Sequence, residues 1–398
     1  MSTAPAASDP DTAKHASRPG RFNLPGVIAI SLAHFIHDVY SSFLAPLLPL
    51  LIEKLSISLT LGGLLSTVMQ LPALLNPWIG SLADRISVRW FLILAPSLTA
   101  IPMSLIGVAP NYGVLLILMV FTGISVSIFH VPAPVVVARM SGRHKGLGMS
   151  FFMVGGEAAR AVGPMVAVSI VALMGMEGFY PVMVVSFFCS ALLYLATRNL
   201  PVISTGAAPI PLIQTWRDLS HILVPISGIL VARGFLHGCM SAFLPTFIAM
   251  NTGNLWLAGA GLTIYETAGV IGVMAAGTLS DRFGRRHLLT FSLLGAPVSM
   301  LAFIWLDGWP AYIMLGCTGF TLLSTTPVML ALIQENAGES PSAANGLFMM
   351  ISFMARSAVV VIVGLTGDLI GLKTTFIIFS LIGFSGLPFV LKLPAHNQ

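Results

Sequence analysis

Gly80-Ser81-Leu82-Ala83-Asp84-Arg85 is a short polar segment within a long apolar sequence. A longer version returns in the second half as Gly277-Thr278-Leu279-Ser280-Asp281-Arg282-Phe283-Gly284-Arg285-Arg286. Asp84 and Asp281 are 197 positions apart, about half of the 398 residues. A second repeated pattern lies upstream of each copy, at an offset of 200 residues. It consists of Phe35, Ile36, His37, Phe43 and Leu44 in the first half and of Phe235, Leu236, His237, Phe243 and Leu244 in the second. A pattern that recurs once at half the chain length indicates an internal duplication.

The composition places the chain in a membrane. It is 56% hydrophobic and only 8% charged, with a mean hydropathy of +0.93, whereas a soluble domain carries about 25% charged residues. The net charge of +5 sits mostly in loops on one side, which fits a lipid bilayer and not nucleic acid as the partner. The three cysteines lie singly in apolar runs, so they predict neither a disulfide framework nor a metal site.

The apolar runs predict an all-α membrane protein with twelve transmembrane helices. A spanning helix needs about 20 apolar residues, and lipid offers no partners to backbone polar groups. The expected spans are 24–51, 58–82, 90–109, 112–138, 147–174, 178–197, 220–250, 256–280, 287–306, 309–333, 342–367 and 371–391. They divide the chain into a disordered tail (1–21), a six-helix bundle (22–197), a linker (198–219), a second six-helix bundle (220–392) and a short tail (393–398).

Basic residues predict the orientation, because loops rich in Lys and Arg stay cytoplasmic. One side holds fourteen of them: Lys14, Arg18, Arg21, Arg85, Arg89, Arg139, Arg143, Lys145, Arg198, Arg217, Arg282, Arg285, Arg286 and Lys392. The other side holds only Lys54 and Lys373. Both termini and the linker are therefore expected in the cytoplasm, with the protein in a bacterial inner membrane.

Six ionisable residues fall well inside the spans. They are Asp38, Glu157 and Glu266, and Arg160, Arg233 and Arg356. Charges at membrane depth cost at least about 2.5–3.5 kcal/mol each and mark candidate functional sites. Because the two signs occur in equal number, we expect them to pair around one polar cavity.

The repeated G-x-L-x-D-R resembles the signature of the major facilitator superfamily. Narrower features resemble its fosmidomycin-resistance group of drug exporters: Ser31-Leu32-Ala33-His34 with Asp38, Ile128-Phe129-His130, Ala138-Arg139-Met140 with Arg143-His144, and Val154-Gly155-Gly156. Ser87 where the superfamily usually has Gly, His37 where the group commonly has Asn, and Val131 between His130 and Pro132 depart from these patterns. The resemblance implies two pseudo-symmetric bundles that rock about a central site.

The candidate proton-coupling residues are His34, His37, Asp38, Glu157 and Glu266. His34 and Asp38 share a helix face at i, i+4, and His37 and His237 are expected to face one cavity from opposite halves. Each also has a structural alternative, such as a packing pair or, for Glu157 and Arg160, self-neutralisation within one helix. Gly155, Gly156 and Gly163 are expected to permit close helix packing.

The candidate substrate-binding residues are His130, Arg160, Arg233, His237 and Arg356. No cofactor is expected. Metal binding by His34, His37, His130 and His237 is disfavoured, because ligands from different halves would have to separate in every transport cycle.

The polar repeat itself predicts a cytoplasmic gate. Gly80, Asp84, Arg85, Gly277, Asp281, Arg282 and Arg285 belong to it. Its two aspartates are expected to pair with basic residues or helix N-termini when the cytoplasmic side is shut.

These features favour a secondary transporter, not an enzyme, that exports a small anionic or zwitterionic compound in exchange for protons, as a monomer. No Walker-type sequence suggests ATP hydrolysis, and His, Asp and Glu carry protons. One alternative is proton-coupled uptake of a small organic anion. A transport-inactive sensor or assembly protein is a remote alternative.

Overall fold

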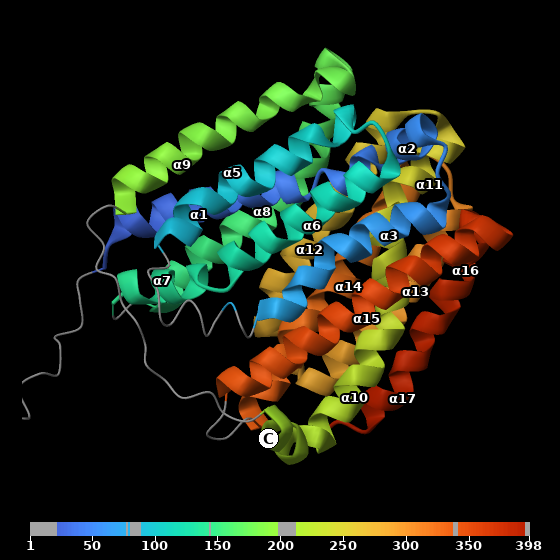
Figure 1. Ribbon diagram of the computed structural model, residues 1–398. Coiled ribbons are helices and arrows are strands. Elements are labelled where there is room, and N and C mark those ends of the chain that lie inside the picture. Colours follow the sequence, from blue (N-terminus) through green and yellow to red (C-terminus); the bar gives the residue numbers. More distant parts are fainter. Residues whose placement is uncertain are drawn as a thin grey trace, which may run out of the picture.

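The computed structural model describes residues 22–76, 79, 89–142, 145–197, 212–336 and 341–394 (Figure 1). Within these ranges the chain is built of helices and short turns. Eleven helical segments are long and apolar enough to cross a membrane, and the shorter Leu59–Leu75 lies where the second span was expected. The remainder of that span, up to residue 82, falls largely outside the described ranges. The prediction of an all-α membrane protein is confirmed.

The first half of the chain supplies five of these eleven segments and the shorter Leu59–Leu75. Its helices are α1 (Leu24–Ser41), α2 (Leu44–Leu55), α3 (Leu59–Gln70) with η1 (Leu71–Leu75), α5 (Arg89–Leu105) with η2 (Ile106–Val108), α6 (Tyr112–His130), α7 (Ala133–Met140), α8 (Lys145–Met174), and η3 (Glu177–Met183) with α9 (Val184–Thr197). The α1–α2 pair forms the first span, and α7 continues the fourth.

The second half supplies the other six. Its helices are α10 (Leu212–Gly238), the π-helical η4 (Cys239–Phe243), α11 (Leu244–Thr252), α12 (Leu255–Phe283), α13 (Arg285–Trp305), α14 (Trp309–Asn336), α15 (Pro341–Ile370), α16 (Leu372–Gly383), η5 (Phe384–Gly386) and α17 (Leu387–Leu391). Residues 212–219, expected in the linker, are therefore already helical, and α10 forms the seventh span together with η4 and α11.

Side-chain caps explain where several helices begin. Asn23 accepts the amide of Gly26 at the start of α1, Ser58 accepts that of Leu61 in α3, and Asn254 accepts that of Trp256 in α12. Such caps satisfy amides that have no partner within the helix.

The first span of each half is interrupted, and the two interruptions lie at equivalent positions of the duplicated sequence. α1 gives way to α2 across a turn at Ser42 and Phe43, and α10 gives way to α11 across the π-turn that ends at Phe243. α2 begins at Leu44 and α11 at Leu244, which is the offset of 200 seen in the sequence. The spans expected over 24–51 and 220–250 are confirmed as single membrane-crossing segments, Leu24–Leu55 and Trp216–Thr252, and each contains one of these breaks.

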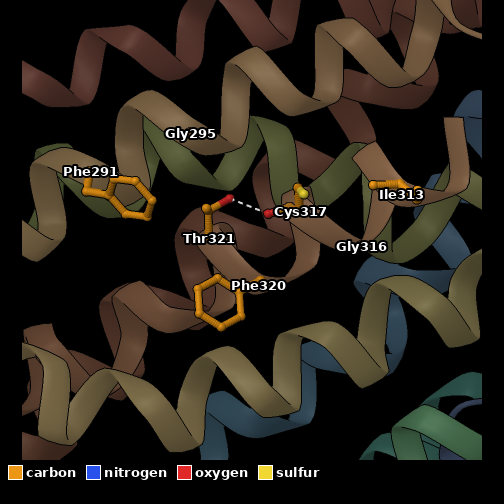
Figure 2. A pocket seen from close by; sticks show the side chains of 7 residues that line it. All are labelled: Phe291, Gly295, Ile313, Gly316, Cys317, Phe320 and Thr321. Carbon is orange, nitrogen blue, oxygen red and sulfur yellow. Dashed lines mark hydrogen bonds between the residues drawn. The ribbon is translucent and has the colours of Figure 1, made fainter. Parts of the chain in front are cut away.

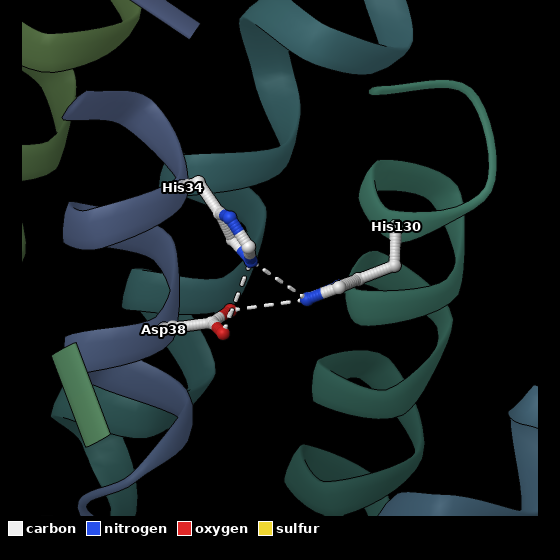
Figure 3. A group of neighbouring side chains, drawn as sticks. All are labelled: His34, Asp38 and His130. Atoms are coloured by element: carbon white, nitrogen blue, oxygen red, sulfur yellow. Dashed lines mark hydrogen bonds and ion pairs between the residues drawn. The ribbon is translucent and has the colours of Figure 1, made fainter. Parts of the chain in front are cut away.

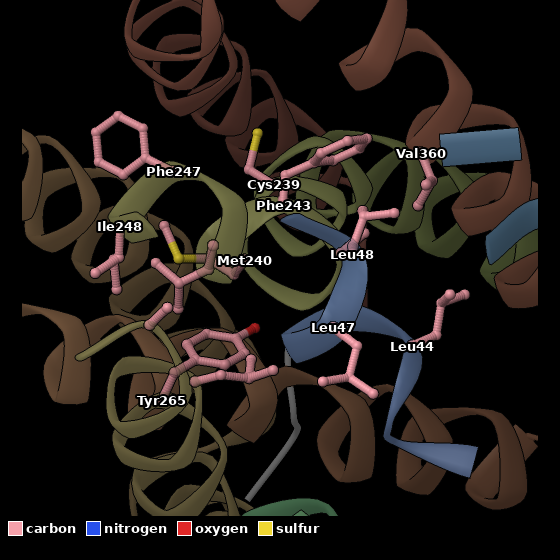
Figure 4. Close-up of a cluster of buried hydrophobic side chains, with 14 of the residues drawn as sticks. Leu44, Leu47, Leu48, Cys239, Met240, Phe243, Phe247, Ile248, Tyr265 and Val360 are labelled. Atoms are coloured by element: carbon pink, nitrogen blue, oxygen red, sulfur yellow. The ribbon is translucent and has the colours of Figure 1, made fainter. Parts of the chain in front are cut away.

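The hydrophobic core is shared at one end of the molecule and divided at the other. Phe43, Leu47 and Leu48 of the first half pack in one cluster with residues of the second half, including Phe243 and Tyr265. Figure 4 shows Leu47 and Leu48 beside Phe243 and Tyr265 in this cluster. By chain order this end is opposite the predicted cytoplasmic face. Towards the cytoplasmic face each half has a core of its own, around Ile222 and Leu289 in one and around Ile30 and Phe129 in the other. The described parts of the two halves are thus joined at the outer end.

Glycines bring α3 and α15 into close contact across the two halves. A Cβ atom on Gly63 would lie 2.8 Å from the carbonyl oxygen of Val360, and one on Gly364 would lie 2.5 Å from that of Leu59. Only a residue without a side chain permits this approach. The contact reinforces the closure at the outer end.

Candidate functional site

Asp38 lies among three histidines inside the first half, and Figure 3 shows it with two of them, His34 and His130. Its Oδ1 is 2.9 Å from Nδ1 of His37 and 3.4 Å from Nε2 of His130, and its Oδ2 is 3.3 Å from Nε2 of His34. The Nε2 atoms of His34 and His130 are 3.2 Å apart. Asp38, His34 and His37 are buried, whereas the side chain of His130 is 36% exposed. The predicted stacking of His34 and Asp38 on one helix face is confirmed.

Helix ends and backbone carbonyls orient this cluster. His130 is the last residue of α6, which ends at the turn formed by Val131 and Pro132. Because proline has no amide donor, the bend expected in this span occurs here. Nδ1 of His130 is 3.0 Å from the carbonyl oxygen of Val126, and Nδ1 of His34 is 2.8 Å from that of Phe152 in α8. Both rings therefore direct Nε2 at Asp38.

His37 points into the bundle and not towards the other half. It is fully buried, stacks on Phe129, and places Nε2 2.9 Å from the hydroxyl of Thr99 in α5. The hydroxyl of Thr99 donates a hydrogen bond to that of Ser125, and the hydroxyl of Ser125 donates to the carbonyl of Ala95. The expectation that His37 faces a cavity opposite His237 was wrong, because the α1 face that carries it packs on α5 and α6.

Gly156 makes room for the cluster. A Cβ atom there would lie 2.5 Å from Cε1 of His34 and 3.2 Å from Oδ2 of Asp38. Gly155 and Gly163 lie equally close to α1, at the carbonyl of Ser31 and the hydroxyl of Ser42. Gly155, Gly156 and Gly163 are therefore packing residues, as the sequence predicted.

Arg160 links the two halves. It forms an ion pair with Glu157 one helical turn away and approaches Glu266 of α12, with Nε 3.9 Å from Oε2. The side chains of Glu157 and Glu266 are only 12% and 10% exposed, whereas that of Arg160 is 44% exposed. The sequence spacing predicted the local pair, and the structure adds a carboxylate from the other half.

Arg233, His237 and Arg356 lie in the second half. Arg233 donates to the hydroxyl of Thr326, and Nδ1 of His237 is 3.1 Å from the hydroxyl of Tyr265. Arg356 stacks over Phe353. The Nε atoms of Arg233 and Arg356 are buried without a hydrogen-bond partner, and no carboxylate among the described residues lies within ion-pair distance of either. The expectation that the three acids would pair with the three arginines was therefore wrong, because Glu157 and Glu266 both lie next to Arg160.

The second copy of the polar repeat forms a compact ion-pair group. Arg285 contacts Asp281 at 2.9 Å and Glu335 of α14 at 2.7 Å, and it also donates to Ser280. Arg282 lies over Phe283, and a Cβ atom on Gly277 would meet nothing within 4 Å. Asp281 thus pairs with a basic residue of its own half. The residues of the first copy, Gly80, Asp84 and Arg85, lie outside the described residues.

An apolar groove of about 450 Å³ lies between α13 and α14 (Figure 2). Its lining residues are Phe291, Gly295, Ile313, Gly316, Cys317, Phe320 and Thr321. Phe291 and Ile313 are about half exposed, and no ionisable group other than the Cys317 thiol lines the groove. It suits contact with lipid tails and is separate from the charged side chains.

Several residues that contact the candidate site residues were not predicted from the sequence. Thr99, Ser125, Tyr265, Thr326 and Glu335 hold the candidate residues in place. Hydroxyl groups are frequent in apolar helices, so nothing in the sequence distinguishes the four hydroxyl-bearing residues of this set from neighbours that bond only to their own helix.

The sequence profile of the Major Facilitator Superfamily matches residues 30–359 and also 229–398. The chain belongs to this superfamily. Its members are transporters, so the chain is a secondary transporter of the membrane and not an enzyme, as its sequence predicted.

Relatives within the superfamily resemble the chain over most of its length. The fosmidomycin resistance protein of Escherichia coli (strain K12) is 26% identical over 379 residues, which cover 90% of each chain. An uncharacterized MFS-type transporter of Bacillus subtilis (strain 168), YfnC, is 24% identical over 97% of this chain and 96% of its own. These matches agree with the resemblance seen in the sequence motifs.

Solved superfamily structures share the fold. A bacterial homolog of the human lysosomal transporter Spinster, in an inward-facing and occupied conformation, has a TM-score of 0.79 at 13% identity and covers 92% of this chain and 95% of its own. A D-xylose-proton symporter has a TM-score of 0.70 at 14% identity, with coverage of 94% and 97%. The major facilitator fold is thereby confirmed.

Proposed function

We propose that this transporter exports small anionic or zwitterionic compounds across the bacterial inner membrane in exchange for protons, with both termini in the cytoplasm. The E. coli relative is named for resistance to fosmidomycin, and the 14-to-2 distribution of basic loop residues supports the orientation. The proposal rests mainly on Arg233 and Arg356, which have no carboxylate within ion-pair distance among the described residues.

Arg233 and Arg356 supply the anion-binding side. Among the described residues, no carboxylate lies within ion-pair distance of either, and both keep a buried Nε without a hydrogen-bond partner. The three arginines also repel one another electrostatically. A buried cation without a counter-charge is costly, whereas a phosphonate or carboxylate would bind it through charge-assisted hydrogen bonds. The substrate would therefore complete the charge balance of the second half.

Glu157 and Glu266 supply the proton-coupling side. Two carboxylates share Arg160, so one negative charge is left without a matching cation. Protonation of one carboxylate would remove the excess negative charge. A zwitterionic substrate whose amino group bound the same carboxylate would compete with the proton, which is the requirement for exchange. The proton-carrying role predicted for Asp38, His34 and His37 stays a prediction.

Uptake together with a proton is the second candidate, and the shared arginine favours it for purely anionic substrates. Protonation of Glu266 would release Arg160 from one partner and make the cavity more positive. A proton and an anion would then bind together, which couples them in the same direction.

Flux through proteoliposomes distinguishes the two candidates, with fosmidomycin as the probe. Exchange predicts accumulation when the vesicle interior is acidic, and cotransport predicts accumulation when the exterior is acidic. Glu266→Gln should abolish the response to the pH gradient while counterflow continues. Glu177→Gln is the matched control, because Glu177 is an exposed surface carboxylate 3.3 Å from Lys54. Flux that does not depend on the pH gradient in either direction would refute the proposal. Normal proton coupling in Glu266→Gln would also refute it.

A further inference from the structure

The cluster of Asp38, His34 and His130 has an excess of lone pairs. Nδ1 of each histidine faces a backbone carbonyl, that of Phe152 for His34 and that of Val126 for His130. A carbonyl only accepts hydrogen bonds, so each neutral ring carries its proton on Nδ1 and leaves a lone pair on Nε2. The contacts thus assign the same tautomer to both histidines.

These two lone pairs and the Asp38 carboxylate converge on one point (Figure 3). The Nε2 atoms are 3.2 Å apart, and they lie 3.3 and 3.4 Å from the carboxylate oxygens. With no hydrogen between them, these three electron-pair donors repel one another. A cation bound at their centre would interact favourably with all three. Two ligands bound at about 2.0–2.1 Å to a tetrahedral Zn²⁺ lie about 3.3–3.4 Å apart. The two Nε2 atoms have nearly this separation, and each lies at such a distance from one oxygen of Asp38, His34 from Oδ2 and His130 from Oδ1.

The surroundings have the form of an outer coordination shell. Histidine ligands of metals generally donate their other ring hydrogen to a carbonyl or carboxylate, and ligating carboxylates are themselves hydrogen-bonded. Here the carbonyl contacts are present for both His34 and His130. The partly exposed side of His130 gives access from outside the cluster.

We propose that His34, Asp38 and His130 bind one divalent transition-metal ion of the Zn²⁺ class. Two imidazole nitrogens and one carboxylate suit zinc and its neighbours, whereas Ca²⁺ and Mg²⁺ prefer all-oxygen sites. The fourth coordination position opens on the exposed side of His130. This site goes beyond the proposed transport activity and does not depend on its direction or coupling ion.

All the ligands lie in one half of the transporter. His34 and Asp38 are on α1, His130 is on α6, and the supporting carbonyls are on α6 and α8. The objection drawn from the sequence assumed a fourth histidine, His237, in the other half, but His237 contacts Tyr265 instead. The ion would therefore move with the first bundle and keep its ligands throughout the transport cycle.

Titration of the purified full-length transporter with Co²⁺ tests the site, because cobalt reports its ligands through visible d–d absorption. After treatment with EDTA, the wild type should bind one Co²⁺ per chain, and Zn²⁺ should displace it. His130→Gln and Asp38→Asn should weaken binding by about 100-fold or more, since changes in the outer shell alone cost 10–100-fold. His237→Gln is the matched control and should bind like the wild type.

His130 lies at a helix end and is partly exposed, so His130→Gln is the least disruptive variant. A monodisperse peak in gel filtration shows that each variant is folded. A rise in the melting temperature of the wild type with Zn²⁺ measures binding independently of cobalt absorption. If the wild type binds no Co²⁺ saturably, the three atoms hold a shared proton or water and the proposal is wrong. Equal binding by wild type and His130→Gln, or equal loss in His237→Gln, would also overturn it.

Discussion

The carboxylate of Asp368, at the end of α15, caps the first turn of α3 in the other half at Thr60, 308 positions away in sequence. It accepts the backbone amides of Leu59 at 2.7 Å and Thr60 at 2.8 Å. A carboxylate at a helix N-terminus satisfies amides that have no partner within the helix and interacts favourably with the helix dipole. This contact fastens the two bundles at their outer end.

Asp368→Asn should weaken that closure. The amide side chain loses the charge and one acceptor oxygen, and because the contact is exposed we expect a cost of about 1 kcal/mol, or roughly a fivefold change in the conformational equilibrium. Spin labels at Glu53 and Asn251, exposed near the ends of α2 and α11, should report a larger population of long distances. Asp307→Asn, an exposed carboxylate on the same face, should leave the distribution unchanged; a similar shift there would contradict the assignment.

Gly156→Ala should destabilise the protein and disturb the histidine cluster. The added methyl would lie 2.5 Å from the ring of His34, and overpacking of this kind costs about 1–3 kcal/mol. The measurement is the melting temperature in detergent. Gly316→Ala is the control in another helix, where a Cβ atom would meet neighbours only at 3.7 and 3.8 Å; it should be neutral or stabilising.

Thr99→Val should cost about 1–3 kcal/mol of stability. The change removes the hydroxyl between His37 and Ser125 and leaves buried polar groups without a partner. Thr122→Val is matched to it, since Thr122 is equally buried but donates only to the carbonyl of Leu118 in its own helix. Equal losses in denaturant unfolding of the two variants would show that the Thr99 hydrogen bonds carry no special weight.

Arg285→Ala should lower stability by up to about 1 kcal/mol at low salt, and by less at high salt. Its partners Asp281 and Glu335 are 67% and 41% exposed, so water and ions screen the ion pairs. Melting temperatures at two ionic strengths test this. Arg282→Ala, which removes a cation–π contact with Phe283, should show a smaller dependence on salt.

Local patterns in the sequence predicted the helices and the contacts within them. The apolar runs located the spans because each must cross the same thickness of lipid. The His34–Asp38 and Glu157–Arg160 contacts follow from helical spacing alone. The breaks at Phe43 and Phe243 also had a local signal in the prolines that follow, although this signal does not specify a turn in one half and a π-turn in the other.

Contacts between helices required the structure. His130 reaches Asp38 only because α1 and α6 have one particular rotation and depth in the bundle, and Glu266 reaches Arg160 from the other half for the same reason. Equal numbers of buried acids and bases do not determine which ones meet. The sequence identified the residues of the candidate site, but their division into a histidine cluster, an arginine with two carboxylates and two unpaired arginines depended on packing.

The separate cores near the cytoplasmic face, around Ile30 in one half and Ile222 in the other, imply that the transporter can be made as two polypeptides. A chain divided between Thr197 and Leu212 would leave each fragment with six helices and an intact interior at one end. The cluster around Phe43 and Phe243 would then act as a subunit interface, and co-expressed fragments should copurify. Replacing Phe243 with Ala should weaken this complementation without preventing either fragment from inserting into the membrane.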